Sequence, residues 1–271
     1  MSLVLVGSIS AMRHLPSNKL IARGSGSNFE RLKMIDHTVE TSPRLKARIA
    51  GGLYLSGVLN LFAGAVVSRL VVNGDAAATA YNILAHETSY RLAFAADIIT
   101  VPCYIAVTAL FYDLFKSVNR SLALLAAFFG LAGSTMWALN DFFYLGPLVV
   151  LGGPHSSTGA DQLQVLALMF LNLHASGSNI VMVAFGFHVI LVGYLIFKST
   201  FLPRILGVWL AIAGLCYLTN GFANFLSPEF AAHLLPYILI PGAVEILLAL
   251  WLFVMGVNVE RWKEQASTAV E

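Results

Sequence analysis

The chain is poor in charge and in cysteine. Only 11% of its 271 residues are Asp, Glu, Lys or Arg, and its two cysteines, Cys103 and Cys216, both lie within apolar runs. Two such cysteines do not form the disulfide framework of a small secreted domain. A net charge of +2 argues against a basic nucleic-acid-binding surface. No Walker loop or dinucleotide fingerprint is present either, because GGLYLSG (51–57) opens an apolar run and follows no strand.

Apolar residues are abundant instead. They make up 58% of the chain, and the mean hydropathy of +0.78 lies far from that of a soluble globular domain. About 20 apolar residues suffice to cross the hydrocarbon core of a bilayer as a helix, which satisfies its own backbone hydrogen bonds there. We therefore predict an all-α, polytopic membrane protein. Its six predicted transmembrane helices are 49–68, 91–113, 121–145, 176–197, 205–226 and 237–257.

The connections between these runs differ in positive charge. Nine Lys or Arg residues border the membrane on one side, whereas Arg69 and Arg91 stand on the other. Positive residues stay on the cytoplasmic side, so both termini are expected to be cytoplasmic. The nine residues are Arg44, Lys46, Arg48, Lys116, Arg120, Lys198, Arg204, Arg261 and Lys263.

Three parts of the chain are expected. Residues 1–43 form a flexible or peripheral extension, because MSLVLVGSISAM is too short to span a bilayer and RGSGSN is polar and rich in glycine. The six-helix domain covers 44–260, and 261–271 form a cytoplasmic tail. Met1, Met12 and Met34 remain alternative translation starts.

The three outer connections resemble short interfacial helices. Residues 74–87 begin with Asp75 as an N-cap, and residues 160–174 have Asp161 in the same role. Residues 227–236 open with a Ser-Pro pair. Each segment has apolar residues at helical spacing, so we expect each to lie on the outer face of the membrane.

Four ordered segments resemble a known family: RLKARIAGGLYL (44–55), DAAATAYNILA (75–85), SVNRSLALLAAFF (117–129) and GYLIFKSTFLPRILGVWLAIAGLCYL (193–218). Together they are similar to an uncharacterised bacterial multi-pass family catalogued as domain of unknown function 4386, over residues 44–258. The resemblance implies a six-helix protein of the bacterial cytoplasmic (inner) membrane. It implies no particular activity, because the family is uncharacterised. In the family an arginine often follows AAFF, where this chain has Gly130.

Polar side chains within the spans gather toward the outer side. An ionisable group inside a membrane is costly and usually faces a partner or a water-filled cavity. We therefore predict a polar cavity that opens outward and binds a small molecule. The alternative is that the carboxyl groups only bond neighbouring polar residues across the bundle. The candidate ligand-binding residues are Asp97, Asp141, His174, Asn220, Asn224 and Glu245.

The histidines raise a separate hypothesis. His174 and His188 are separated by a helical rise of about 21 Å, so they cannot share one metal ion. His188 lies near the middle of the membrane and is expected to bond a backbone carbonyl or an asparagine. His86, His174 and His233 could instead meet at the outer rim, with Asp97 or Glu245, as a zinc site for hydrolysis. Without that convergence they form ordinary hydrogen bonds at the interface, and no other cofactor is predicted.

Two further patterns have structural explanations. Ser176, Gly177 and Ser178 are small residues that allow close helix packing. Trp137, Tyr144 and Tyr237 are interpreted as an aromatic belt at the membrane surface.

Three classes of function remain open. The first is binding or transport of a small molecule through the outer cavity. The second is a membrane-embedded enzyme, such as a metal-dependent hydrolase, that uses His174 and the nearby carboxylates on a small or lipid-like substrate. The third is a structural or assembly partner without a site. The expected partners are the lipid bilayer and a small-molecule or lipid ligand, without nucleic acid, and the sequence does not decide the oligomeric state.

Overall fold

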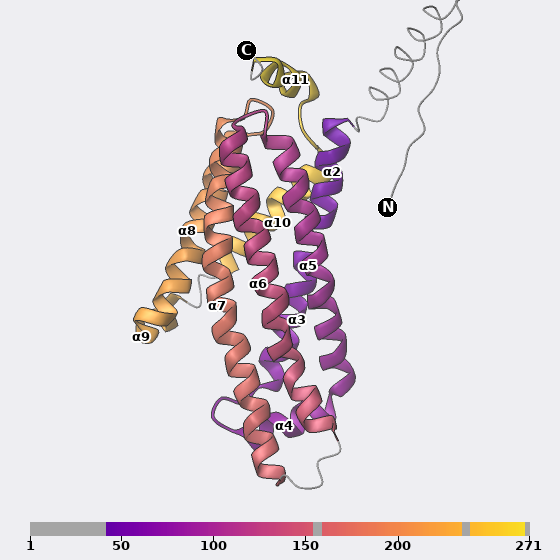
Figure 1. The fold of residues 1–271 in the computed structure, drawn as a ribbon, viewed down its shortest axis with the longest axis vertical. Coiled ribbons are helices and arrows are strands. Elements are labelled where there is room, and N and C mark those ends of the chain that lie inside the picture. Colours follow the sequence, from indigo (N-terminus) through magenta and orange to yellow (C-terminus); the bar gives the residue numbers. More distant parts are fainter. Residues whose placement is uncertain (1–41, 154–158, 235–238, 269–271) are drawn as a thin grey trace, which may run out of the picture. The chain divides into compact units, whose positions relative to one another are not determined.

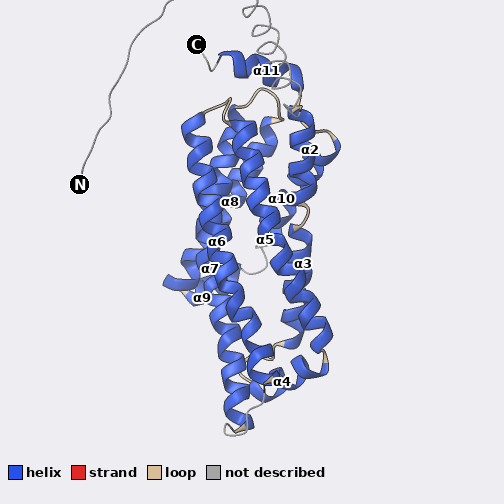
Figure 2. Ribbon diagram, turned by 45° about the vertical axis from the view of Figure 1, so that its right-hand side comes forward, coloured by secondary structure: helices blue, strands red, loops and turns tan. Residues whose placement is uncertain are grey.

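The regular secondary structure is α-helical throughout the part of the chain that the computed structural model describes, residues 42–153, 159–234 and 239–268 (Figures 1 and 2). The prediction of an all-α fold is therefore confirmed. The predicted extension 1–43 falls almost entirely outside the described residues. The helices are α2 (Pro43–Tyr54), α3 (Gly57–Leu70), α4 (Ala76–Ala85), α5 (Glu87–Phe115), α6 (Arg120–Gly152), α7 (Ala160–Lys198), α8 (Arg204–Leu226), α9 (Pro228–Leu234), α10 (Leu239–Val254) and α11 (Val259–Thr268).

Five segments of the described chain are long and apolar enough to cross a membrane. A sixth is present if α10 and α11 are taken together, although they are bent by 100°. The chain is thus multi-pass, with five or six candidate spans. The predicted first span corresponds to α2 and α3, which a short turn at Leu55 and Ser56 separates. The five segments are Pro43–Leu70, Glu87–Phe115, Arg120–Gly152, Ala160–Lys198 and Arg204–Leu226.

Local sequence explains where several helices begin. The side chain of Ser42 accepts a hydrogen bond from the backbone nitrogen of Leu45, and a proline follows it at the first helical position. Asp75 caps α4 as predicted, since its Oδ1 accepts from Ala78 at 2.9 Å. Asn119 caps α6 in the same manner.

The predicted interfacial helix at 160–174 is wrong as a separate element. Residues 160–198 form the single helix α7, and Gly159, not Asp161, is its N-cap. No proline interrupts this stretch, so backbone hydrogen bonding continues without a break. The other two outer helices are present as α4 and α9.

The helices form a closed ring at the end of the bundle where α2 begins. Around the ring, α2 packs on α5, α5 on α6, α6 on α7, α7 on α8, α8 on α10 and α10 on α2. The side of α7 that faces α8 is rich in glycine. A Cβ atom at Gly193 would lie 2.6 Å from the backbone nitrogen of Ala211, so the two backbones approach each other closely.

The other end of the bundle has a different arrangement. There α3, α5, α6 and α7 continue beyond α8, and α4 lies across their tips against α7 (Figures 1 and 2). With 39 residues α7 is about 58 Å long, against about 34 Å for the 23 residues of α8. Among the described helices, α3 packs along α5 and not along α7.

Each end of the bundle has its own hydrophobic core. One core joins residues of α2, α5, α6, α7, α8 and α10 near the end where α2 begins. The second joins residues of α3, α4, α5, α6 and α7 near α4. The space between these two cores contains the polar residues discussed below.

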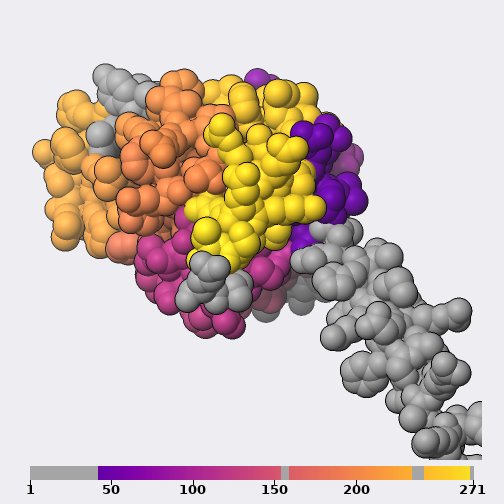
Figure 3. All heavy atoms as spheres, turned by 90° about the horizontal axis from the view of Figure 1, so that it is seen from above, coloured from indigo at the N-terminus to yellow at the C-terminus, as the bar shows by residue number. Residues whose placement is uncertain are grey.

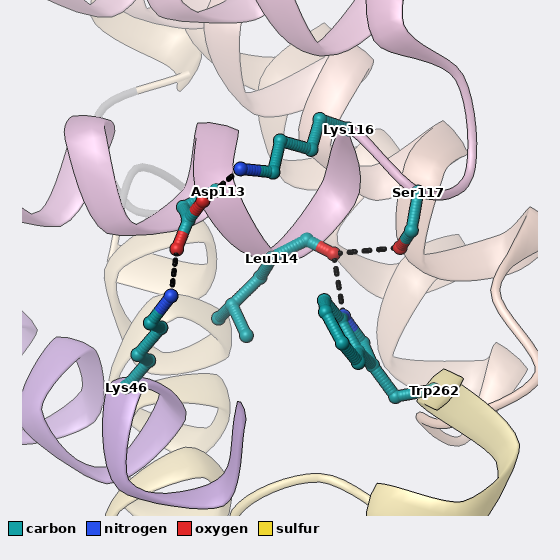
Figure 4. Close-up of polar contacts among 6 residues, drawn as sticks. All are labelled: Lys46, Asp113, Leu114, Lys116, Ser117 and Trp262. Atoms are coloured by element: carbon teal, nitrogen blue, oxygen red, sulfur yellow. Dashed lines mark hydrogen bonds and ion pairs between the residues drawn. The ribbon is translucent and has the colours of Figure 1, made fainter. Parts of the chain in front are cut away.

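Polar contacts fasten α11 and α2 to the end of α5 (Figure 4). The carboxylate of Asp113 pairs with Lys46 on α2 and with Lys116. Nε1 of Trp262 on α11 donates a hydrogen bond of 2.9 Å to the carbonyl oxygen of Leu114. Figure 3 shows the yellow C-terminal segment across this end of the bundle, beside the indigo start of α2.

Candidate functional site

A cavity of about 190 Å³ lies between the two hydrophobic cores. Side chains from α3, α5, α6, α7, α8 and α10 line it, so every helix of the ring except α2 contributes, together with α3. An engineered cavity of about 150 Å³ is large enough for benzene, so this one has room for a small molecule. Its polar lining residues are Asn60, Asp97, Asn140, His174, Ser178 and Glu245.

The depth of the cavity follows from helix geometry. Glu245 is nine residues from Val254 at the end of α10, a rise of about 14 Å. His174 is 24 residues from Lys198 at the same end of the bundle, a rise of about 36 Å. A hydrocarbon core is roughly 30 Å thick. The cavity therefore extends from the middle of such a layer to the boundary away from α11.

Asp97 on α5 joins three helices. It is only 3% exposed, and its carboxylate accepts hydrogen bonds from two side chains. Asn60 on α3 donates from Nδ2 to Oδ1 at 2.6 Å, and Trp137 on α6 donates from Nε1 to Oδ2 at 3.4 Å. These bonds direct the carboxylate toward the cavity that all three residues line.

Asp141 on α6 is a second buried carboxyl group in this region. It is 1% exposed, and within the described part of the structure neither of its oxygens has a hydrogen-bond partner. Its carboxyl lies close enough to that of Asp97 for their charges to interact. Buried acceptors without partners are unusual and costly, so Asp141 is left in need of a hydrogen-bond donor.

His174, Asn140 and Ser178 form a network between α6 and α7. Nδ2 of Asn140 donates to the carbonyl oxygen of His174 at 3.0 Å and to Oγ of Ser178 at 3.1 Å. Nδ1 of the His174 ring lies 3.2 Å from the same Nδ2 and 3.3 Å from the Asn140 carbonyl oxygen. Ser178 donates its own proton to the His174 carbonyl at 2.9 Å. The ring therefore contacts Asn140, and Ser178 is not arranged as a nucleophile activated by it.

Glu245 on α10 borders the cavity at its deep end. The carboxyl is 9% exposed and accepts a hydrogen bond of 3.1 Å from the hydroxyl of Tyr104 on α5. The ring of Tyr104 packs edge-on against Trp137 and Phe185, with centroids 5.6 and 5.5 Å away. Those two rings are themselves 5.9 Å apart. A triangle of aromatic rings thus lines the cavity beside the carboxyl group, and Tyr217 lines it from α8.

The predicted ligand-binding residues divide into two groups. Three of the six, Asp97, His174 and Glu245, line one cavity. Asp141 is buried close to Asp97 and is not part of the lining.

The two asparagines predicted on α8 do not line the cavity. Asn220 donates to the sulfur of Met182 on α7, at 3.3 Å. Asn224 donates to the carbonyl of Asn220, one turn earlier in the same helix. These two residues serve the packing of α8 instead of the cavity.

The proposed zinc site is not formed. The described residues contain no group of three His, Cys, Asp or Glu side chains that could hold a metal ion. His86 ends α4, and His233 lies exposed on α9, where its ring bonds the carbonyl of Glu229. Only His174 of the three lines the central cavity. The three histidines do not meet, because α4 and α9 lie at different levels of the bundle (Figure 1).

The aromatic-belt interpretation is wrong for two residues. Trp137 lines the cavity and bonds Asp97, and Tyr144 is 2% exposed within the core near α4. Tyr237 lies outside the described residues. Tyr104, Trp137 and Phe185 therefore belong to the site, although the sequence analysis assigned none of them to it. The one available signal was the spacing of Trp137 and Asp141 by four residues, which places both on one face of α6.

His188 forms the bond predicted for it. Its Nδ1 lies 2.8 Å from the carbonyl oxygen of Ala126 on α6, in the core near α11. A Cβ atom at Gly130 would lie 2.8 Å from the same nitrogen. The His188 ring therefore occupies the space that a side chain at position 130 would need.

The long apolar helices and the polar cavity enclosed by several of them define a multi-pass helical membrane protein. The chain belongs to the family described as domain of unknown function DUF4386, whose model matches residues 49–256. No curated protein and no solved structure matches the chain.

Proposed function

We propose that the protein binds a small molecule in the cavity between the two cores. The observation that supports this most directly is the lining: Asp97, His174 and Glu245 come from three helices and meet around space of about 190 Å³. A carboxyl group within a membrane span is energetically costly. Fixing how the helices pack against one another would need fewer such groups than the chain has here.

The proposal includes a location and an orientation. The chain resides in a bacterial cytoplasmic membrane with both termini in the cytoplasm, and the ligand reaches the cavity from the outer side. Nine of the eleven Lys and Arg residues that border the spans support this orientation, because they lie on the side of the termini. The core near α11 supports entry from the opposite side, since it fills the space between the cavity and that end.

Ligand binding can be tested with a variant that fills the cavity. Met182→Trp enlarges a side chain that lines it, and Met169→Trp makes the same change at an exposed position of the same helix. The purified full chain would be screened in detergent by thermal unfolding against small cationic, neutral and anionic molecules. We expect at least one class to raise the Tm of the wild type and of Met169→Trp but not of Met182→Trp.

Two outcomes would contradict the proposal. If no molecule of the panel stabilises the wild type, the cavity has no small-molecule ligand of this kind. If Met182→Trp responds as strongly as Met169→Trp, binding occurs elsewhere on the protein.

A further inference from the structure

We infer that the ligand is a small organic cation, held with its ammonium group between buried carboxyl groups and the faces of aromatic rings. This inference rests on the proposed function and adds the chemical class of the ligand. It combines three independent features of the cavity: its charge, its aromatic lining and its size.

The charged side chains that line the cavity are all acidic. Asp97 and Glu245 line it, Asp141 lies close enough to Asp97 for their charges to interact, and none of the lining residues is Lys or Arg. All three carboxyl groups are at most 9% exposed. Buried charges are normally paired, and no basic side chain of the lining pairs with Asp97 or Glu245. A cationic ligand would supply the missing positive charge, whereas an anion would be repelled.

The aromatic rings favour an organic cation over a metal ion. Tyr104, Trp137 and Phe185 pack edge to face with centroids 5.5–5.9 Å apart, and Tyr217 lines the same space. An ammonium group is attracted by a ring face within about 6 Å of its centroid, with tryptophan the best partner. The rings are close enough together for one cation to meet several of them. Metal cations instead prefer clustered oxygen or nitrogen ligands.

The size of the cavity limits the ligand. Its volume of about 190 Å³ moderately exceeds the roughly 150 Å³ of a cavity that accommodates benzene. A quaternary ammonium compound with a short polar arm, such as choline, is of matching size. Its arm could bond Asn140, Ser178 or His174, which line the cavity away from Glu245.

The test compares three molecules of nearly equal shape and different charge. Choline is cationic, 3,3-dimethylbutan-1-ol replaces its nitrogen with carbon, and 3,3-dimethylbutanoate is anionic. Binding to the detergent-purified full chain would be measured by calorimetry, with tetramethylammonium as a second cation. We expect choline to bind at least about tenfold more tightly than the neutral analogue, and the anion not to bind.

Two variants and two matched controls assign this preference to the cavity. Glu245→Gln removes a carboxylate and Trp137→Leu removes a ring, and each should weaken choline binding about tenfold while changing the neutral analogue much less. Glu229→Gln on exposed α9 and Trp209→Leu on the outer surface of α8 make the same changes away from the cavity. Both controls should bind as the wild type does.

The outcomes separate the two proposals. If the neutral or anionic analogue binds as well as choline, or if only neutral or anionic molecules of the screening panel bind, the inference fails and the cavity remains a binding site. If nothing binds, both proposals fail. Should Glu245→Gln not fold, Trp137→Leu decides alone, and unchanged choline binding by that variant overturns the inference.

Discussion

The hydroxyl of Tyr104 on α5 donates a hydrogen bond of 3.1 Å to Oε2 of Glu245 on α10, across 141 positions of sequence. The two helices are joined here at the deep end of the cavity. The two residues are far apart in sequence, so this bond forms only because the helices close into a ring.

We expect Tyr104→Phe to lower the free energy of unfolding by about 1 to 2 kcal/mol, because Glu245 loses a donor within a buried site. Thermal or denaturant unfolding in detergent would measure the loss. Tyr112→Phe on the same helix is the control, since Tyr112 is half-buried and does not line the cavity. Equal effects of the two changes would contradict the role of this bond.

Asp141→Asn should stabilise the protein without ligand by about 1 to 3 kcal/mol. The asparagine removes a buried charge beside Asp97 and adds an amide that can donate to it. Unfolding in detergent is the measurement, and Asp161→Asn at the exposed start of α7 is the matched control. A loss of stability in Asp141→Asn would show that its carboxylate is already satisfied.

Gly177→Ala should destabilise the protein by about 1 to 3 kcal/mol. A Cβ atom there would lie 1.9 Å from Oδ1 of Asn140, so α6 and α7 would have to separate or the network around His174 would break. Gly64→Ala on α3 is the control, because no atom lies within 4 Å of its Cβ position. That change should be neutral or stabilising by up to about 1 kcal/mol. The comparison fails if both variants unfold alike.

Trp262→Phe should loosen α11 from the end of the bundle. It removes the indole donor to the Leu114 carbonyl at a cost of about 1 kcal/mol. Limited proteolysis between α10 and α11 should become faster, while Trp209→Phe on the outer surface of α8 should leave the rate unchanged. An unchanged rate in Trp262→Phe would mean that other contacts, such as those of Gln265 with Thr200, hold the helix.

The orientation can be tested by cysteine labelling in intact cells. In a background of Cys103→Ala and Cys216→Ala, His233→Cys on α9 should react with a membrane-impermeant maleimide from outside. Glu264→Cys on α11 should react only after the cells are opened, because the proposed orientation puts that end in the cytoplasm. The reverse pattern would overturn the proposed orientation.

Composition and run length were sufficient to predict the helical membrane fold, because a bilayer accepts few structures and each span needs a long apolar run. Local chemistry predicted Asp75 as a cap and the backbone bond of His188, since both need only neighbouring groups. The sequence also placed Asp97, His174 and Glu245 in one region, by counting residues from the basic ends of the spans.

Only the tertiary structure decided which side of each helix faces inward. Lipid tails are as apolar as a protein core, so a span shows little difference between its two faces in sequence. Trp137 could equally have faced the membrane surface, and Asn220 could have faced the cavity. Their placement depends on which helices pack closely, and this is set by contacts such as Gly177 against Asn140 and Gly193 against α8.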